Sequence, residues 1–537
     1  MNIDKKRWKH GLFSLRDNLS TKVYAKKETT LETKAALENK ETMSENKSKQ
    51  ENANMFVPNA GSPAIKEITP LKEPHVYAAI STDPKTLGLQ YLVMEPTLDD
   101  TEKKALKEIK NILFQVLDVD LRTIGSREKT EEWLKNQVLK IVKDYKIKAE
   151  EGTIDKLQYY LLRDLINFGK IDPLMHDHMI EDISCDGPKI PIYVWHRRYE
   201  SIPTNIGFDD EEELDSFVVR LAYLAGKHIS IANPMLDSSL SDGSRIQLTY
   251  GKEVTRKGST FTIRRFRADP LTVVDLIDLG TLGYDIAAWF WYAIEKKRNI
   301  LVGGGTASGK TTTLNALSAF IPTNSKVITI EDTAELNLPS ENWISSIARI
   351  GFGSSGVADI TLFDLLKAAM RQRPDYVIVG EVRGDEAFTL FQAMATGHGG
   401  LSSIHCDSAS SAFSRLESEP MNIPRTLLTI LDTVAMTSKV RIGDRTTRRV
   451  TDVVEVVELD PVSREIVTNE VFKWHPAQDV FEYSGRSVLM ERIAKDLGLT
   501  KEYIKEELER RKLLLEWMGL NKIRRFSEVG QVIREYY

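Results

Sequence analysis

The run GGTASGKT at residues 304–311 carries more information about the fold than any other part of this sequence. It matches the phosphate-loop pattern G-x-x-x-x-G-K-[ST] at every required position. The apolar segment 298–302 before it is typical of a strand, and Leu314, Leu317 and Ile321 form the apolar stripe of a following helix. In such a loop, backbone amides surround phosphate groups, and the helix N-terminus adds a partial positive charge. The sequence therefore predicts a nucleotide-phosphate site.

Residue types inside this loop predict the role of each position. Lys310 would neutralise the β- and γ-phosphates, and the Thr311 hydroxyl would bind Mg²⁺. The expected ligands are therefore a nucleoside triphosphate and Mg²⁺. The predicted nucleotide-binding residues of the loop are Gly304, Gly305, Thr306, Ala307, Ser308, Gly309, Lys310, Thr311 and Thr312.

Two further apolar segments end in carboxylates. The segment 375–381 (DYVIVGE) is a short apolar strand that ends at Glu381, and ligands of α/β sheets bind at the carboxyl ends of strands. Glu381 would hold the water shell of Mg²⁺ or polarise the attacking water. The strand 327–330 leads into Glu331, Asp332 and Glu335, which repel one another unless they share a cation. The predicted Mg²⁺ ligands are Thr311, Glu331 and Glu381.

The 537 residues divide into segments of different composition. Residues 1–64 are polar, with eight Lys or Arg against two Asp in 1–27, and we expect a disordered tail because little apolar surface offsets the entropy of ordering. Residues 65–270 predict an N-terminal α+β domain, in which amphipathic helices precede alternating strands. In 271–537 buried strands alternate with amphipathic helices. This pattern predicts an α/β domain with a largely parallel sheet covered on both faces, followed by a helical extension.

Charge, cysteine content and hydropathy exclude several classes of protein. Lys and Arg number 73 and Asp and Glu 78, which argues against a dedicated nucleic-acid coat. The two cysteines, Cys185 and Cys406, are too few for a disulfide framework or a four-thiolate zinc site and favour a reducing, cytosolic compartment. The most apolar run, 286–294, is about half the length that crosses a bilayer.

That apolar run contains four consecutive aromatic residues, Trp289, Phe290, Trp291 and Tyr292. Such a cluster is compatible with a platform on which single-stranded bases stack. Because Ile286, Ala293 and Ile294 surround it in sequence, we interpret it instead as part of a buried helix.

Four segments together resemble the type II/type IV secretion and pilus-assembly ATPase family. Besides the phosphate loop, the segment 330–335 (IEDTAE) is similar to the family's Asp box, 373–381 (RPDYVIVGE) to its Walker B segment, and 395–405 (ATGHGGLSSIH) to its His box. Their order and spacing fit over about residues 271–451, and generic phosphate-loop proteins do not carry the His box. The segment 264–267 (RRFR) is similar to the arginine-bearing edge through which the family's N-terminal domain closes on nucleotide.

The resemblance also implies that the nucleotide is ATP, and it implies roles for site residues. It nominates Glu335 for activating the attacking water and Glu381 for the metal shell, and the sequence leaves open which of the two is the general base. The predicted catalytic residues are Lys310, Glu335, Glu381, His398 and His405. The candidates for contact with the γ-phosphate are Arg245, Arg264, Arg265 and Arg267, although alternating arginines on a strand most often face water or pair with acids.

Further features resemble the archaeal branch of this family, which includes archaellum-motor and archaeal pilus ATPases. They lie in 180–187, in 242–245, in the Thr-Ala-Ser of the phosphate loop at 306–308, and in 415–424. The family implies a RecA-like P-loop core and a homo-hexamer that docks on a polytopic membrane platform protein and drives filament subunits. We therefore expect a cytoplasmic protein at the inner face of the membrane. No structural metal is expected, and the basic start at 1–27 is either a solvated tail or a contact for anionic lipid.

Two other functions remain as alternatives. Hexameric motors of the conjugation type, which move nucleic acid, share the phosphate loop. The mild acidity of the chain and the lack of a recognisable nucleic-acid module argue against this alternative, and no specific nucleic-acid partner is expected. A non-catalytic, nucleotide-gated scaffold is the second alternative, against which Lys310, Thr311, Glu335 and Glu381 are all present.

Overall fold

The computed structural model describes residues 65–84, 86–116, 127–145, 147, 151–266, 269–349, 359–443 and 445–537. Glu67–Ile80 and Leu89–Tyr537 form one compact unit, to which the elements discussed below belong almost entirely. Of the other described residues, 65–66, 81–84 and 86–88 fall outside this unit. The tail expected to be disordered, 1–64, lies outside the described residues.

The first sheet is built from the strands that precede the phosphate loop. Its strand order is β1-β2-β3-β6-β5-β4-β9-β8-β7. Neighbouring strands pair antiparallel from β6 to β7 in this order, whereas β3 and β6 pair in parallel. The strand bounds are β1 Ile65–Lys72, β2 Val76–Thr82, β3 Leu89–Met94, β4 Ile180–Cys185, β5 Pro191–His196, β6 Glu200–Gly207, β7 Met235–Ser239, β8 Arg245–Thr249 and β9 Thr260–Arg264.

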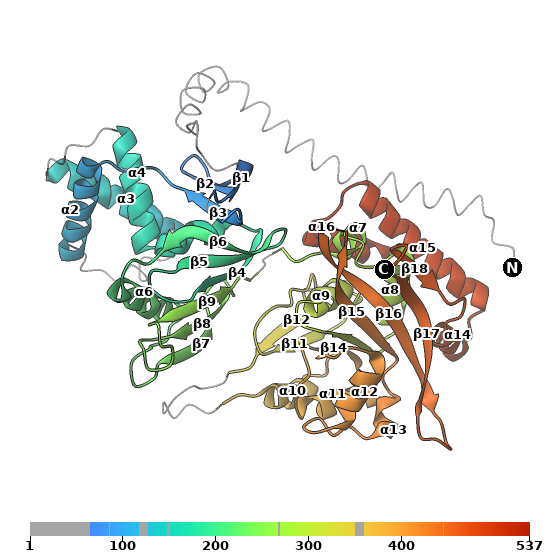
Figure 1. Ribbon diagram of the computed structural model, residues 1–537. Coiled ribbons are helices and arrows are strands. Elements are labelled where there is room, and N and C mark those ends of the chain that lie inside the picture. The colour runs from blue at the N-terminus through green and yellow to red at the C-terminus, as the bar shows by residue number, and fades with distance from the viewer. Residues whose placement is uncertain are drawn as a thin grey trace. The chain divides into compact units, whose positions relative to one another are not determined.

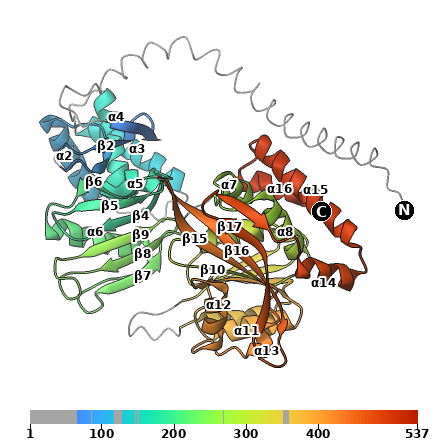
Figure 2. The same ribbon diagram turned by 45° about the vertical axis from the view of Figure 1, so that its right-hand side comes forward.

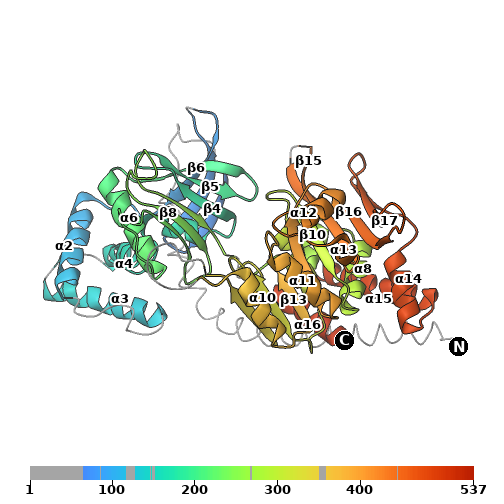
Figure 3. The same ribbon diagram turned by 90° about the horizontal axis from the view of Figure 1, so that it is seen from below.

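The helices of this region form two groups. α2 (Asp100–Val116), α3 (Arg127–Asp144) and α4 (Glu151–Leu165) lie next to one another (Figure 3) and bury a small core of their own, which includes Ile109 and Leu134. α6 (Glu211–Leu224) instead packs its apolar stripe on the first sheet. Short η3 (Gly169–Ile171) and α5 (Asp172–His176) connect the helices to β4. The order of elements agrees with the α+β pattern expected from the sequence.

The second sheet has the order β12-β11-β13-β14-β10-β15-β16-β17-β18. All pairs from β12 to β15 are parallel, and the long strands from β15 onward, visible in Figure 2, pair antiparallel. The bounds are β10 Ile300–Gly304, β11 Val327–Glu331, β12 Trp343–Ile347, β13 Tyr376–Val379, β14 Gly399–His405, β15 Thr433–Ile442, β16 Arg445–Leu459, β17 Ile466–His475 and β18 Val480–Tyr483.

Helices cover both faces of this sheet (Figure 1), because its buried strands are apolar at successive positions. Ile300 and Val302 of β10 enter one core, whereas Leu301 between them enters the other. The first core contains α7 (Val273–Asp278), α8 (Tyr284–Glu295), α9 (Lys310–Ser318), α14 (Val488–Leu497), α15 (Lys501–Leu520) and α16 (Phe526–Tyr536). The second contains α10 (Leu362–Met370), α11 (Glu386–Ala395), α12 (Ala409–Glu417) and α13 (Arg425–Leu428).

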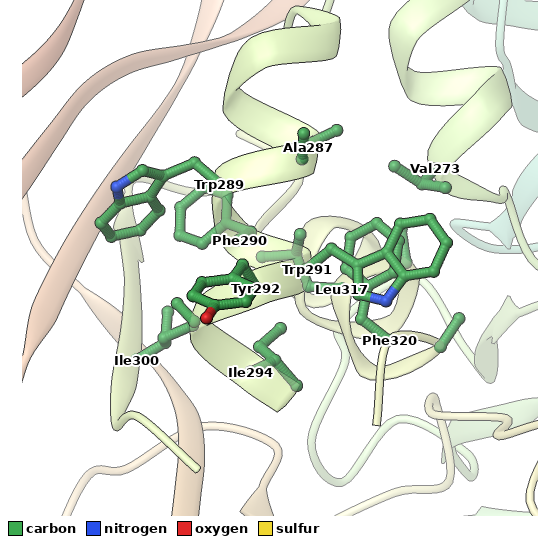
Figure 4. Close-up of a cluster of buried hydrophobic side chains, with 14 of the residues drawn as sticks. Val273, Ala287, Trp289, Phe290, Trp291, Tyr292, Ile294, Ile300, Leu317 and Phe320 are labelled. Carbon is green, nitrogen blue, oxygen red and sulfur yellow. The ribbon is translucent and has the colours of Figure 1, made fainter. Parts of the chain in front are cut away.

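The aromatic run of α8 lies in the centre of the first core (Figure 4). The Trp291 ring stacks on Phe320 with ring centroids 5.0 Å apart, and its indole N–H donates to the Tyr537 hydroxyl at 2.8 Å. Trp289 donates to Ser487 Oγ at 3.1 Å. Since these rings are covered by protein on all sides, the interpretation of the run as core is confirmed and a base-stacking platform is excluded there.

The fold class expected from the sequence is therefore confirmed: a RecA-like α/β core with a parallel sheet, preceded by α+β elements. The exact division into domains at 65–270 and 271–537 stays a prediction. Among the described residues, no helix combines the length and the apolar composition needed to cross a membrane.

Candidate nucleotide site

The phosphate loop connects the end of β10 to the start of α9, as the sequence predicts. Two of its glycines are required by geometry. A Cβ on Gly304 would lie 2.4 Å from both Ser308 Oγ and the Thr437 carbonyl oxygen. Gly309 adopts a left-handed conformation (φ 95°) that turns the chain into the helix, where a side chain would be strained. The loop shape thus depends on both residues.

Hydrogen bonds from side chains hold this loop from within. Ser308 Oγ donates to the Gly305 carbonyl oxygen at 2.9 Å, and Thr437 Oγ1 on β15 donates to the Gly303 carbonyl oxygen at 2.9 Å. Ser308 is 2% exposed. Its hydroxyl therefore shapes the loop, which leaves the Ser308 backbone N–H as its means of contacting a phosphate.

Lys310 begins α9 and folds back over the loop. Its Nζ donates to the Gly305 carbonyl oxygen at 3.0 Å. Burial lowers the pKa of Lys310, and the nearby Glu381 carboxylate opposes that shift. Thr311 and Thr312 follow in the first turn and are half-buried. A charged ammonium group held at the loop by one carbonyl is well placed to exchange that contact for phosphate oxygens.

Parallel pairing brings the other predicted groups to the same edge of the sheet. Gly304 at the end of β10 is in register with His405 at the end of β14, and Ile330 on β11 is in register with Val379 on β13. Because parallel strands share a direction, the residues that follow β11 and β13 emerge beside the phosphate loop. Glu331, Glu335, Glu381 and His405 all lie at this carboxyl edge.

Glu331, predicted as a metal ligand, is 2% exposed at the end of β11. Its Oε1 accepts hydrogen bonds from the backbone N–H groups of Glu335 and Leu336, each at 2.9 Å. Burial raises the pKa of Glu331 to about 7. Its Oε2 has no hydrogen-bond partner among the described residues. One carboxylate oxygen therefore shapes the turn that presents Glu335, and only the other is available to a metal shell.

The two predicted water-activating glutamates differ in their surroundings. Glu335 is exposed on the turn after β11. Glu381 is half-buried after Gly380, whose N–H donates to the Ile330 carbonyl oxygen at 2.9 Å. The Arg383 guanidinium donates to Glu381 Oε2 at 2.6 Å. The sequence analysis did not identify Arg383 as a site residue. The pattern that could have indicated it is a basic residue two positions after an acidic residue at the end of a strand.

The two histidines of the His box lie at opposite ends of one strand. β14 runs from Gly399 to His405, so His405 reaches the phosphate-loop edge, whereas His398 precedes the strand. A strand of this length separates its ends by roughly 20 Å. His398 Nδ1 lies 3.1 Å from both Thr396 Oγ1 and the Ala393 carbonyl oxygen, at the C-terminal end of α11. The structure does not bring His398 to this phosphate loop, which corrects the grouping expected from the sequence.

The four candidate arginines have different environments. Arg245 on β8 forms an ion pair with Asp237 at 2.6 Å and also donates from Nη1 to Thr333 Oγ1 at 3.1 Å, within the Asp-box segment. Arg264 is exposed and is in register with Asp182 on β4. Arg267 lies outside the described residues.

Arg265 is occupied within the first sheet. Its guanidinium donates to the backbone carbonyl oxygens of Asp177, Ile180 and Met175, the last at 2.7 Å. These bonds tie the end of α5 and the start of β4 to the residue that follows β9. In this conformation the Arg265 side chain is a structural element of the sheet and is not free to contact a phosphate, contrary to the expectation from the sequence.

The donor set of the edge fits a Mg²⁺-bound nucleotide. A Cβ on Gly305 would meet no atom within 4 Å, so there is open space at the loop. Thr311, Glu381 and the unpartnered Glu331 Oε2 supply the hard oxygen ligands that Mg²⁺ takes in proteins. Lys310 and the first turn of α9 supply the positive charge that a triphosphate requires.

The chain is similar to several known proteins. The family described as Type II/IV secretion system protein matches residues 165–507. An uncharacterized protein of Methanocaldococcus jannaschii, MJ0900, is 37% identical over 496 residues, which cover 88% of this chain and 88% of that protein. The type IV secretion system protein PtlH of Bordetella pertussis is 33% identical, over 45% of this chain and 80% of its own length.

A solved structure, the VirB11 ATPase from the Brucella suis type IV secretion system in complex with sulphate, is also similar. It is 25% identical, with a TM-score of 0.27, and the match covers 53% of this chain and 94% of that chain. The long family match, together with a relative similar over nearly the whole chain, establishes the relationship. The chain belongs to the Type II/IV secretion system protein family.

Proposed function

We propose that this protein is an ATP hydrolase that powers the assembly or secretion of filament subunits. The observation that carries the proposal is the convergence of three groups at one edge of the second sheet: the phosphate loop with Lys310, the turn with Glu335, and Glu381. A loop alone binds phosphate, whereas carboxylates at the same edge add the means to activate water.

Each group has a distinct task in this proposal. The loop amides and Lys310 hold the β- and γ-phosphates, and Lys310 exchanges its bond to the Gly305 carbonyl oxygen for phosphate oxygens. Bound Mg²⁺ would neutralise phosphate charge, held by Thr311 and Glu381. Glu335 or Glu381 accepts the proton of the attacking water. Glu331 keeps the Glu335 turn in place through its two backbone hydrogen bonds.

The proposal extends to assembly and partners. We propose a homo-hexamer that docks on a polytopic membrane platform protein at the cytoplasmic face, with an archaellum or a pilus as the filament. Membership of a family described as Type II/IV secretion system protein supports this part of the proposal. We propose that the domain formed by residues 65–270 moves relative to the domain formed by 271–537 as ATP is bound and hydrolysed. Arg245 on β8 would contribute positive charge to the nucleotide site.

The test is direct. Purified full-length protein is assayed for Mg²⁺-dependent release of phosphate from ATP, alone, with anionic vesicles and with single-stranded DNA, while light scattering follows the mass with and without nucleotide. We expect hydrolysis, hexamers in the presence of nucleotide, and stimulation by lipid above that by DNA. Absence of nucleotide binding would contradict the proposal, and stronger stimulation by DNA would favour a nucleic-acid motor.

A further inference from the structure

Arg383 connects the two acidic turns of the nucleotide site. From the turn after β13, its Nη2 donates to Glu381 Oε2 at 2.6 Å, and its Nη1 lies 3.8 Å from Asp332 Oδ2 on the turn after β11. The guanidinium thus lies between two carboxylates that come from different strands. Without a cation there, two carboxylates so arranged would repel each other.

The backbone around Arg383 is fixed by a buried carboxylate. Glu386 at the start of α11 is 6% exposed, and its Oε1 accepts hydrogen bonds from the N–H groups of Arg383 and Gly384 at 2.6 and 2.8 Å. A Cβ on Gly384 would lie 3.0 Å from Glu386 Oε2, so the turn passes close to this side chain. The backbone of Arg383 is therefore held in place, while its guanidinium group remains accessible to solvent.

The ion pair itself is suited to exchange. The Arg383 side chain is 62% exposed, and ion pairs in contact with water contribute little to stability. A divalent cation carries twice the charge and binds carboxylate oxygens directly, so it competes effectively with such a guanidinium. Arg383 holds the carboxylates in position without blocking the site permanently.

We propose that Arg383 is a positioning residue that balances the charge of Glu381 and Asp332 in the nucleotide-free protein and releases Glu381 to the metal when Mg²⁺ and nucleotide bind. This inference rests on the proposed function, since it concerns the same edge of the second sheet. Arg383 then has two effects in the nucleotide-free protein. It keeps Glu381 oriented, and it lowers the affinity of the site for a bare divalent cation.

The experiment measures Mn²⁺ binding to the full-length protein without nucleotide, by electron paramagnetic resonance. Arg383→Gln removes the positive charge and should bind Mn²⁺ several-fold more tightly than the unchanged protein. Arg383→Lys keeps the charge but lacks the planar guanidinium fork, so its Mn²⁺ affinity should lie between those of Arg383→Gln and the unchanged protein. The matched control is Arg486→Gln, which breaks an ion pair with Glu491 in a different part of the chain. The Arg486 side chain is 67% exposed, similar to that of Arg383, and its replacement should leave the Mn²⁺ affinity unchanged.

A second readout separates positioning from general structure. In Arg383→Gln, the Mg²⁺ concentration that gives half-maximal ATP hydrolysis should fall while kcat stays close to the unchanged value, because Arg383 competes with the metal for Glu381 only before Mg²⁺ and nucleotide bind. Adding Glu381→Gln to Arg383→Gln should abolish the gain in Mn²⁺ affinity. Equal or weaker Mn²⁺ binding by both Arg383 variants would overturn the inference, even if ATP hydrolysis is observed. Failure of the unchanged protein to bind a fluorescent ATP analogue would instead contradict the proposed function.

Discussion

The hydroxyl oxygen of Ser308 in the phosphate loop lies 3.0 Å from the hydroxyl oxygen of Thr437 on β15. This pair joins the loop to the neighbouring strand, and Thr437 extends the connection to the Gly303 carbonyl oxygen. Both side chains are buried, so water does not replace a lost partner easily. The loop is held by the sheet beside it as well as by its own turn.

Replacing Thr437 with Val should therefore loosen the phosphate loop. The change keeps the shape and removes the hydroxyl, which should lower the free energy of unfolding by about 1–3 kcal/mol and raise the KM for ATP. The control is Thr433→Val on the same strand, because the buried Thr433 hydroxyl has no hydrogen-bond partner among the described residues. That variant should be neutral or more stable in thermal unfolding. Equal behaviour of the two variants would contradict the role of Thr437.

Lys310→Ala should abolish ATP turnover and leave the fold intact. The change deletes a charge that meets the phosphates and breaks only a hydrogen bond to the Gly305 carbonyl oxygen. Lys473→Ala, which removes an exposed lysine paired with Glu470 on β17, is the control and should turn over ATP normally. Circular dichroism checks the fold of both variants. Appreciable hydrolysis by Lys310→Ala would show that the loop assignment is wrong.

Glu335→Gln and Glu381→Gln should bind ATP and hydrolyse it far more slowly. Each change keeps the size of the side chain and removes its negative charge, and loss of a general base typically costs roughly 10²-fold or more in kcat. Single-turnover kinetics at saturating ATP distinguish the two residues. The variant with the larger loss identifies the general base, and near-normal kcat in either would remove that residue from the mechanism.

The neighbouring residues Arg264 and Arg265 should respond in opposite ways to substitution by Ala. Arg265→Ala removes the guanidinium that donates to three backbone carbonyl oxygens and should lower the free energy of unfolding by about 2–4 kcal/mol. Arg264 is exposed, so Arg264→Ala should leave stability unchanged. If Arg264 contacts the γ-phosphate, kcat falls in that variant with little change in KM. Denaturant unfolding combined with steady-state kinetics tests both expectations.

Protonation of His196 should destabilise the first sheet. Burial lowers the pKa of His196 from its usual 6.5, and its Nδ1 accepts a hydrogen bond from the Arg198 N–H at 3.2 Å, which requires that nitrogen to be unprotonated. The unfolded chain therefore takes up a proton more readily than the folded one as pH falls below about 6.5. This contribution to stability is present above pH 6.5 and is lost progressively below it.

The measurement compares melting temperatures at pH 8 and pH 5.5. His196→Asn keeps an acceptor at the δ position and should reduce the loss of stability at the lower pH. His228→Asn changes an exposed histidine and should show the same pH dependence as the unchanged protein. An identical acid response in all three proteins would show that His196 does not contribute.

Much of the fold follows from local pattern. The strand, loop and helix at 298–320 and the strand before Glu381 were predictable because apolar residues and required glycines occur together. β14 was harder, because its first two residues are glycines, which strands disfavour. They are needed there: a Cβ on Gly399 would lie 2.6 Å from the Tyr376 ring and one on Gly400 2.4 Å from Met394.

The parts of the site that escaped prediction depend on long-range contacts. Local sequence does not distinguish Arg264, which faces outward, from Arg265, which turns back to bind carbonyl oxygens of residues about 90 positions earlier. In the same way, His398 and His405 occur in one motif, but a strand between them carries them to opposite edges of the sheet. The partner of a charged side chain is set by tertiary structure, which a motif does not encode.

The two cysteines give this protein a pair of natural probes. Cys185 ends β4 in the first sheet, and Cys406 follows β14, with its sulfur 2.6 Å from where a Cβ on Gly303 would lie, beneath the phosphate loop. Burial raises the pKa of both thiols, that of Cys185 to about 11, and only an exposed thiolate reacts quickly with alkylating reagents. The alkylation rate of each cysteine in the unaltered chain therefore reports how often its own sheet opens, and nucleotide should slow the reaction of Cys406 more than that of Cys185.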